Sequence, residues 1–457
     1  MIKKKDIVRL EIEHLAFPKK GRGQVEGIPV KVKEVLPGQL VEVRITKKRE
    51  GQMEGQLLQV IRRAPYETRQ PCRSFARCGG CTYQTISLEK ENEMKESQVL
   101  ELLEQAGVTG YTYDGIQTSP TTRGYRNKCE FSFGDTGKDG ALALGMRRRH
   151  SFYEVETLPA ECDLVDGDFI KIIQGTLSFF SAHPTSFYHK GRHEGVLRHL
   201  VVRKGYYTGE ILLNLVTTSA GTEVPYAAWV QAILALPLAG KICGILHTVN
   251  DSVADVVQSD GTVLLYGQAY LTDRLFDLTF RITAGSFFQT NTAGAEALYQ
   301  MVKDYVGQTK DTVLFDLYCG TGTISQVLAG QCRQVIGVEL VEEAVKAARE
   351  NAAQNGIENC TFLAGDVLEV VEQLEQKPDI IVVDPPRDGI HPKAIGKIIA
   401  FGAPRIIYVS CKPSSLARDL AIFQGNGYQV ERLGMLNQFC HTEHIETVAL
   451  LTKKENV

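Results

Sequence analysis

A cysteine at a strand end is the residue best placed for covalent chemistry in this chain. The apolar run 405–410 ends directly before Cys411, and the preceding apolar run, Ile380–Val383, ends at Asp384-Pro385-Pro386-Arg387. Most cysteines are buried core thiols, and Cys411 taken without its context is interpreted the same way. Its place on the strand after the Asp384 motif reverses that interpretation. This position favours Cys411 as a nucleophile. The site must then stabilise its thiolate form at neutral pH.

The Asp384 motif indicates the kind of atom that is attacked. Methyltransferases acting on exocyclic amines tend to carry Asn- or Asp-Pro-Pro-aromatic at such a strand end, but here the fourth residue is Arg387. A cysteine close to the strand end that carries this methyltransferase-like motif suggests a target atom that is not nucleophilic by itself. Pyrimidine C5 is such an atom. Thiolate addition at C6 makes the ring an enolate, whose C5 can attack a sulfonium methyl group. A general base must then remove the C5 proton.

The general base is predicted in a histidine- and glutamate-containing run near the carboxyl end. His441, Glu443 and His444 suggest a metal site, but their spacing does not match His-Glu-x-x-His, and residues 448–451 are strand-like. A metal is therefore not expected there. Glu446, at the entry to that strand, is the better base.

A glycine turn and two acidic residues predict a nucleotide-like cofactor. The strand 313–317 leads into Gly320-x-Gly322, while Glu339 and Asp366 end the next two strands. The turn lets the backbone approach a ligand, Glu339 suits a ribose diol, and Asp366 suits an adenine amino group. S-adenosylmethionine and a dinucleotide both fit this arrangement. The third glycine of a dinucleotide fingerprint is absent, which favours S-adenosylmethionine.

These residues require a particular set of elements to position them. Strands and helices alternate from residue 313 to residue 410, which predicts an α/β, doubly wound, Rossmann-like parallel sheet with ligands at its carboxyl edge. We expect three domains: a small β-barrel at 1–64, an α+β middle domain at 65–280 and the catalytic domain at 281–457. A charged helix is predicted from Ser87 to Ala106, within a segment of about 87–110 that packs on the catalytic domain.

The amino-terminal domain is basic. Five short alternating strands separated by Gly- and Pro-containing turns are predicted in residues 5–63, which suits a barrel of the oligonucleotide-binding kind. Residues 1–63 hold fifteen Lys and Arg against eight Asp and Glu, although the whole chain has a net charge of -3. A basic amino-terminal domain on an otherwise mildly acidic chain suggests that this domain binds a polyanion. The alternative is a charged surface that is only solvated.

Composition bounds the remaining possibilities. With 457 residues, 43% hydrophobic and 23% charged, the chain is typical of a multidomain globular protein. No apolar stretch is long enough for a membrane span, and the amino terminus lacks the apolar region of a secretory signal. We therefore expect a cytoplasmic protein with no membrane partner. Eleven cysteines then favour thiol chemistry or metal binding over disulfides.

Five spaced motifs together resemble the RNA uracil-5-methyltransferase family from about residue 280 onward. The motifs are Phe288-Gln289-Thr290-Asn291, Asp316-Leu317-Tyr318-Cys319-Gly320-Thr321-Gly322-Thr323, Asp384-Pro385-Pro386-Arg387, Tyr408-Val409-Ser410-Cys411 and His441-Thr442-x-His444-x-Glu446.

The resemblance implies specific roles for these residues. It implies Cys411 as nucleophile and Glu446 as the proton-abstracting base. Phe287 is placed to stack on the uracil or, equally, to pack in the core. The implied contacts with S-adenosylmethionine are Gln289, Tyr318, Gly320, Thr323, Glu339, Asp366 and Asp384.

The amino-terminal part resembles the ribosomal-RNA branch of this family, the RlmD/RumA type. The barrel is similar to a TRAM domain, and Cys72-x5-Cys78-x2-Cys81 with Cys162 resembles the ligands of a [4Fe-4S] cluster. Four thiolate ligands suit an iron–sulfur cluster and a zinc ion about equally well. A structural cluster is expected, since a radical enzyme would use Cys-x3-Cys-x2-Cys and leave one iron without a cysteine.

The resemblance has departures. Asn437 and Cys440 stand where the family normally has Asp and Pro, and Lys412 stands where Asn is commoner. These changes leave the catalytic pair intact and bear on active-site geometry and RNA preference.

The expected function is methylation of a uridine in 23S ribosomal RNA, with RNA and not DNA as partner. The segments Gly124–Lys128 and Arg147–Arg149 are expected to help grip the RNA backbone, although surface arginines are often merely solvated. Transfer RNA is the alternative substrate. Cytosine-5 methylation is disfavoured because Pro386 stands where those enzymes carry cysteine. A non-catalytic RNA-binding protein or chaperone is the alternative of another class.

Overall fold

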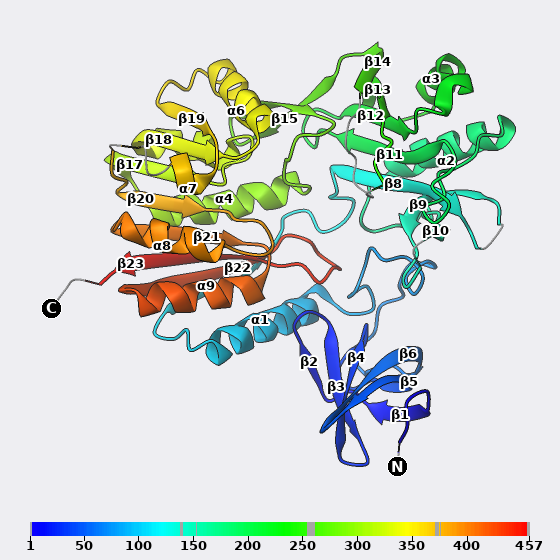
Figure 1. Ribbon diagram of the computed structural model, residues 1–457, viewed down its shortest axis with the longest axis horizontal. Helices are drawn as coiled ribbons and strands as arrows, with labels where there is room; N and C mark the ends of the chain where they lie inside the picture. The colour runs from blue at the N-terminus through cyan, green and yellow to red at the C-terminus, as the bar shows by residue number, and fades with distance from the viewer. Residues whose placement is uncertain are drawn as a thin grey trace. The chain divides into compact units, whose positions relative to one another are not determined.

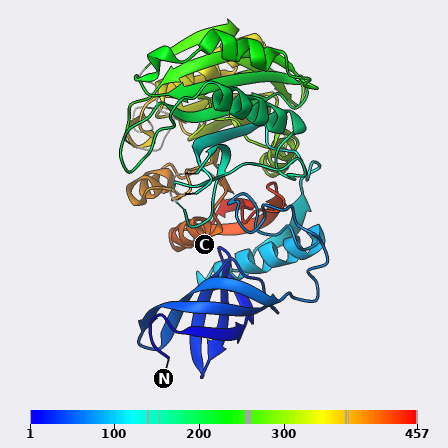
Figure 2. The same cartoon turned by 90° about the vertical axis from the view of Figure 1, so that its right-hand side faces the viewer.

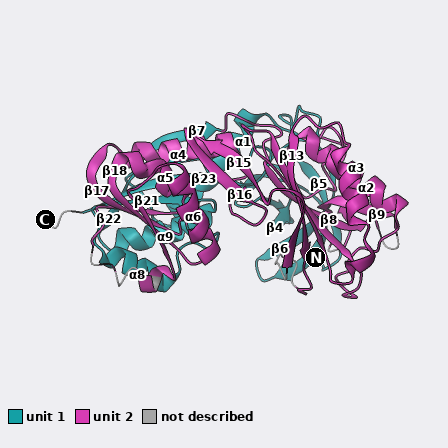
Figure 3. Cartoon of the chain, turned by 90° about the horizontal axis from the view of Figure 1, so that it is seen from above, with its two compact units in different colours: residues 1–71, 81–118, 385–457 teal, residues 72–80, 119–384 magenta. Residues whose placement is uncertain are grey.

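The chain forms two compact units, each built from separate stretches of sequence (Figure 3). The computed structural model describes residues 2–137, 140–151, 153–253, 261–370, 374 and 376–454. Unit 1 contains residues 1–71, 81–118 and 385–457, and unit 2 contains residues 72–80 and 119–384. These units cut across the three domains expected from the sequence, whose boundaries stay a prediction.

Unit 1 begins with a curled six-stranded sheet, drawn in blue in Figures 1 and 2. Its strand order is β1-β5-β6-β4-β3-β2, and side chains alternate between a buried and an exposed face along β3 and much of β5. The sequence predicts five strands; the sixth is β2, whose three residues are too few to show alternation. The strands are β1 (Ile7–Glu11), β2 (His14–Ala16), β3 (Lys20–Val25), β4 (Ile28–Lys33), β5 (Leu40–Arg49) and β6 (Gln52–Arg62).

The rest of unit 1 is a sheet with helices. Strands β21 and β22 each pair antiparallel with β23, and β7 pairs parallel with β22. The predicted helix is confirmed as α1, whose cap Ser87 accepts a hydrogen bond from the backbone N–H of Lys90. The elements are α1 (Leu88–Gln105), β7 (Thr112–Thr118), α8 (Pro392–Ala400), β21 (Arg405–Ser410), α9 (Pro413–Gly425), β22 (Tyr428–Asn437) and β23 (Glu446–Lys453).

Unit 2 contains a seven-stranded sheet of order β10-β9-β8-β11-β12-β13-β14. Strands β11 and β12 follow each other in the chain and pair antiparallel. Helices α2 and α3 contact each other (Figure 1). The elements are β8 (Lys128–Asp135), β9 (Leu142–Arg147), β10 (Val155–Glu156), α2 (Gly167–Ala182), β11 (Leu197–Lys204), β12 (Glu210–Thr217), η1 (Gly221–Glu223), α3 (Tyr226–Leu234), β13 (Lys241–Val249) and β14 (Gly261–Gly267).

Unit 2 also contains the predicted parallel strands, in the order β19-β18-β17-β20. All their pairings are parallel, and Val313–Leu317 of β17 is buried throughout, which confirms a sheet covered on both faces. The elements are β15 (Tyr270–Leu275), β16 (Leu278–Thr283), α4 (Thr292–Val306), β17 (Thr309–Leu317), α5 (Thr323–Leu328), η2 (Ala329–Gln331), β18 (Cys332–Glu339), α6 (Glu342–Gln354), β19 (Cys360–Ala364), α7 (Val367–Val370) and β20 (Ile380–Val383).

Within the described ranges, no helix is both long enough and apolar enough to cross a membrane.

Candidate active site

The turn between β17 and α5 has a left-handed backbone at three residues. Tyr318, Gly320 and Gly322 have φ angles of 68°, 54° and 72°. The turn is fixed on β18, because the backbone N–H groups of Tyr318 and Cys319 both donate to the carbonyl of Val338, at 3.0 and 3.1 Å. Three such residues turn the chain sharply at the carboxyl edge of the sheet, where a ligand can approach the backbone.

Replacing Gly322 with alanine is expected to destabilise this turn. A Cβ atom there would lie 2.5 Å from Cε1 of Phe362, and the left-handed backbone disfavours any side chain. Strain and crowding together predict a loss of about 2–4 kcal/mol in the free energy of unfolding. Urea denaturation measures it. Gly330→Ala is the matched control, since its Cβ would meet nothing within 4 Å. Equal stability of the two variants would contradict this role for Gly322.

Glu339 is held against the same turn. Its Oε2 accepts a hydrogen bond from the N–H of Gly320 at 3.1 Å, and its Oε1 accepts one from the N–H of Val341 at 3.0 Å. A Cβ atom on Gly320 would meet nothing within 4 Å, so the space over the turn is open. Leu340, next to Glu339, is 68% exposed. A fixed carboxylate beside an open backbone and an exposed apolar side chain suits a ribose with an attached flat ring.

Two carboxyl groups stand at and after strand ends next to the turn, Asp316 buried and Asp384 partly exposed. Burial raises the pKa of Asp316 to about 7, although the hydrogen bond from Ser325 Oγ to its Oδ2, at 2.5 Å, opposes the shift. Burial also raises the pKa of Asp384 to about 7, and the charge of Asp316 adds to the effect. Within the described ranges, Oδ1 of Asp316 is buried without a hydrogen-bond partner. This pair favours a nearby cation, which would stabilise the ionised form.

The segment before α4 lies against the glycine turn. The hydroxyl of Thr321 donates to the carbonyl of Phe287 at 3.2 Å. The Phe287 ring is 65% exposed, so core packing is excluded for it, whereas Phe288 is buried. Gln289 is also buried, and Asn127 donates to its carbonyl at 2.8 Å. The turn and this segment therefore bring Gln289 and Phe287 to the region of Gly320.

The remaining two cofactor candidates lie in the same unit. Asp366 is exposed and comes two residues after β19, and the neighbouring N–H of Gly365 donates to the carbonyl of Glu339 at 2.9 Å. The hydroxyl of Thr323, at the start of α5, lies 3.1 Å from that of Tyr299. Unit 2 thus carries all seven predicted cofactor residues.

Cys411 and Glu446 lie in unit 1, at the same end of one strand pair. Ser410, the last residue of β21, pairs with Thr447 of β23 in antiparallel register, so extending the register by one position would set Cys411 opposite Glu446. Paired residues of antiparallel strands point to one face, about 4.5–5.5 Å apart at Cβ. Cys411 is partly exposed and Glu446 is buried. The register therefore brings a thiol and a carboxyl group together.

Cys411 lies directly before the amino-terminal end of α9. Lys412 caps α9 directly after Cys411, and the positive end of a helix dipole stabilises a nearby anion. The Lys412 N–H donates to Ser410 Oγ at 3.2 Å, which fixes the turn. Arg387 of the Asp384 motif lies with Nη2 at 3.4 Å from Nε2 of His444, in the run that leads to Glu446.

Three of the four predicted cluster ligands belong to unit 2. Burial raises the pKa of the Cys78 thiol, the N–H of Gly80 opposes this, and negative charge on Cys162 and Cys72 adds to it. Burial also raises the pKa of Cys162, although hydrogen bonds from the backbone N–H groups of Leu164 and Val165 lower it. Cys81 is buried in unit 1. Among the described residues, no His, Cys, Asp or Glu group has a metal-binding arrangement.

The two basic segments expected to grip RNA make contacts within unit 2. The Arg148 guanidinium pairs with Glu154 at 2.8 Å, and Nε of Arg149 donates to the carbonyl of Cys78 at 2.9 Å. Asn127 is buried and holds the Gln289 segment. These side chains therefore also have structural roles.

Sequence reasoning missed two features of the cofactor region. Leu340 is a large apolar residue left exposed directly after a strand-end carboxylate. Asp316 appeared only as part of a motif, and its burial was not anticipated. A single carboxyl group inside an apolar strand is a signal that could have indicated a perturbed titratable group.

Known proteins are similar to this chain over almost its whole length. Residues 245–454 match the family model described as tRNA (Uracil-5-)-methyltransferase. An "Uncharacterized RNA methyltransferase" of Clostridium tetani is 44% identical, covering 98% of both chains. Another, of Caldanaerobacter subterraneus subsp. tengcongensis, is 45% identical, covering 98% of this chain and 99% of the relative.

A solved structure has the same mixed α/β fold. It is the Pyrococcus abyssi tRNA (uracil-54, C5)-methyltransferase in complex with S-adenosyl-L-homocysteine, with a TM-score of 0.75 and 25% sequence identity. The match covers 97% of this chain and 99% of that chain. These similarities show that the chain belongs to the RNA uracil-5-methyltransferase family, and that it methylates uracil C5 in RNA with S-adenosylmethionine.

Proposed function

We propose that this enzyme makes 5-methyluridine in 23S ribosomal RNA, in the cytoplasm, with Cys411 as nucleophile and Glu446 as general base. The observation that supports the catalytic assignment is the β21–β23 register, whose last pair, Ser410 with Thr447, adjoins both residues. A nucleophile and a base on one face of two paired strands have the fixed relative geometry that covalent catalysis needs.

The reaction begins when the Cys411 thiolate adds to C6 of uracil. This forms a carbon–sulfur bond and an enolate. C5 would then attack the sulfonium methyl group of S-adenosylmethionine, whose sulfur–methyl bond breaks and whose remainder leaves as S-adenosylhomocysteine. Glu446 removes the C5 proton, the C5=C6 double bond re-forms, and the Cys411 sulfur leaves as thiolate. The target base must first be extruded from its stack to reach the thiol.

The methyl donor is assigned to residues of unit 2. The open space over Gly320 and the fixed carboxylate of Glu339 support this assignment. Phe287, whose ring is exposed, is assigned to stacking on the uracil. The cofactor residues are Gln289, Tyr318, Gly320, Thr323, Glu339, Asp366 and Asp384.

Cofactor affinity is expected to depend on pH. Because the pKa of Asp384 is raised to about 7, the carboxyl group is partly protonated at neutral pH and must lose its proton to stabilise a bound cation. Affinity should rise with pH, and Kd should grow by up to about tenfold for each pH unit below 7. Calorimetric titration from pH 5.5 to 8.5 measures it. Asp384→Asn should flatten the profile, and a wild-type Kd that is constant across pH 7 would contradict the assignment.

A [4Fe-4S] cluster on Cys72, Cys78, Cys81 and Cys162 is also proposed, in a structural role. Two observations support the cluster. Negative charge on neighbouring cysteines of this set raises the pKa of Cys78 and of Cys162, and backbone N–H groups donate to both of these sulfurs. Such hydrogen bonds are common around iron–sulfur clusters. Protein purified without oxygen should be brown and contain about four iron atoms. A colourless preparation containing zinc would overturn the cluster.

The barrel and the cysteine cluster support ribosomal RNA, through their resemblance to that branch. Transfer RNA is a second candidate, favoured by one observation: the solved transfer-RNA enzyme covers 97% of this chain, too much to omit the barrel. Mass spectrometry of both RNAs from a deletion strain tests the two. We expect 5-methyluridine to disappear from 23S ribosomal RNA, at one site or two. Loss from transfer RNA alone would overturn the ribosomal substrate.

A further inference from the structure

A buried ionic network lies beneath the loop that leads to Glu446. Residues 438–445 connect β22 to β23, and Leu436 pairs with Glu446 at the base of this loop. The network comes from α1, where the side chains of Glu91 and Lys95 are only 0% and 2% exposed. The pair is joined at 2.8 Å, from Lys95 Nζ to Glu91 Oε1. A buried ion pair is stable only when its remaining hydrogen-bonding capacity is satisfied.

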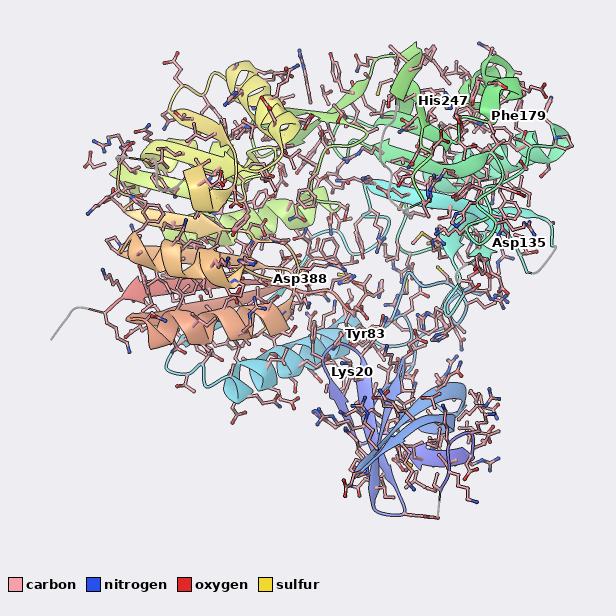
Figure 4. The ribbon with its side chains drawn as sticks, in the orientation of Figure 1. Lys20, Tyr83, Asp135, Phe179, His247 and Asp388 are labelled. Carbon is pink, nitrogen blue, oxygen red and sulfur yellow. The ribbon has the colours of Figure 1, made fainter. Side chains whose placement is uncertain are left out.

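Glu91 holds the middle of the loop by its backbone. The N–H of His441 donates to both carboxylate oxygens, at 2.9 and 3.0 Å. His441 has a left-handed backbone, with φ of 66°, so the chain turns at the residue whose N–H the carboxylate accepts. On its other side, the carbonyl of His441 accepts from the N–H groups of Thr82 and Tyr83, at 2.6 and 3.1 Å. Tyr83 is itself buried and is labelled in Figure 4.

Asn437 completes the network at the start of the loop. Its Nδ2 donates to Glu91 Oε1 at 3.0 Å, and its Oδ1 accepts from Lys95 Nζ at 2.7 Å. An amide can donate to the carboxylate and accept from the ammonium at once, whereas an ionised carboxylate can only accept. An aspartate at position 437 would set a second carboxylate against Glu91. The chain's departure from the family pattern at this position therefore has a physical reason.

We propose that Glu91, Lys95 and Asn437 are positioning residues for the removal of the C5 proton. They fix both the start and the middle of the loop, so that its end presents Glu446 beside Cys411. The inference rests on the proposed role of Glu446. Proton transfer requires the carboxylate within hydrogen-bond reach of the proton, and a displacement of about 1 Å can cost 10²-fold in rate. Cys411 follows β21, which the network does not include, so methyl transfer should suffer much less.

The test measures the two steps separately. RNA carrying tritium at uridine C5 is mixed with S-adenosylmethionine carrying a ¹⁴C-methyl group, in single-turnover conditions. The wild-type enzyme should release one tritium for each methyl transferred. In Glu91→Gln, methyl transfer should stay within about threefold of wild type, while tritium release slows at least about tenfold. A covalent protein–RNA band should then accumulate in denaturing gels. A loss that is purely structural would lower both rates together.

Asn437→Asp is a second variant, in case Glu91→Gln folds poorly. It should also slow tritium release, because two carboxylates would face one ammonium. The double variant Glu91→Gln/Asn437→Asp restores one carboxylate and one amide around Lys95. Its tritium release should recover to within about threefold of wild type. Glu93→Gln is the control, since Glu93 lies on the same helix but its side chain is 62% exposed. It should leave both rates unchanged.

Glu446→Gln, measured in parallel, separates two kinds of failure. If its tritium release keeps pace with methyl transfer, Glu446 is not the base and the proposed mechanism fails. If Glu446→Gln uncouples the two steps but Glu91→Gln and Asn437→Asp do not, the positioning role alone is overturned. The same conclusion follows if the double variant shows no recovery.

Discussion

Replacing Cys411 with alanine is expected to lower the rate of methyl transfer to RNA by at least about 10⁴-fold. Uracil C5 has almost no nucleophilic character until a thiolate adds at C6, so no other side chain can substitute for the sulfur. Affinity for S-adenosylmethionine should stay near the wild-type value, because the residues assigned to the cofactor belong to unit 2. Transfer of a tritiated methyl group and calorimetric titration measure the two quantities.

Cys243→Ala is the matched control for this variant. Cys243 is another partly exposed thiol, and its Sγ donates to the carbonyl of Ile211 at 3.2 Å, in the middle region of unit 2. Its removal should leave methyl transfer within about twofold of wild type. RNA containing 5-fluorouridine adds an independent check, since it should trap the wild-type enzyme as a covalent adduct and leave Cys411→Ala free. Retention of a tenth of the activity by Cys411→Ala would exclude covalent catalysis.

Glu446→Gln is expected to stop the reaction after methyl transfer. The substitution keeps the shape of a buried residue at the start of β23, so the fold should persist. Without a carboxylate the C5 proton remains, the sulfur cannot leave, and turnover should fall by about 10²–10⁴-fold. The stalled adduct carries the methyl group, so a slow-migrating, labelled protein–RNA band should appear in denaturing gels.

Glu431→Gln controls for the loss of one carboxylate from the same sheet. Glu431 is exposed on β22, and its replacement should leave turnover within about twofold of wild type. Full turnover by Glu446→Gln, or slow turnover with no methylated adduct, would show that another group removes the proton.

Local sequence signals locate the strand ends that carry the proposed cofactor residues. The glycine turn and the acidic residue Glu339 lie at or next to strand ends, and hydrophobic runs between turn residues locate such ends directly. Position at a strand end then fixes the edge of the sheet on which a side chain lies, because parallel strands share a carboxyl edge. The proximity of Cys411 and Glu446 is different. It depends on the antiparallel register of β21 and β23, which no spacing in the sequence specifies.

The network under the loop was not predictable from pattern. Glu91 and Lys95 are an i, i+4 charged pair on a charged helix, a pattern typical of a solvated face. Burial of the pair results from contacts with Asn437 and His441, more than 300 residues along the chain. Hydrophobic periodicity carries no information about contacts at that separation.

The make-up of unit 1 has a consequence for how the protein is made. Strand β7 lies early in the chain but pairs with β22, and α1 buries its ion pair against a loop that follows β22. During synthesis, the ion pair of α1 and the pairing edge of β7 therefore stay exposed until β22 and the loop after it have left the ribosome. Unit 2, complete by residue 384, can fold well before that. We expect nascent unit 1 to be the part that chaperones protect and that stalled translation exposes to proteolysis.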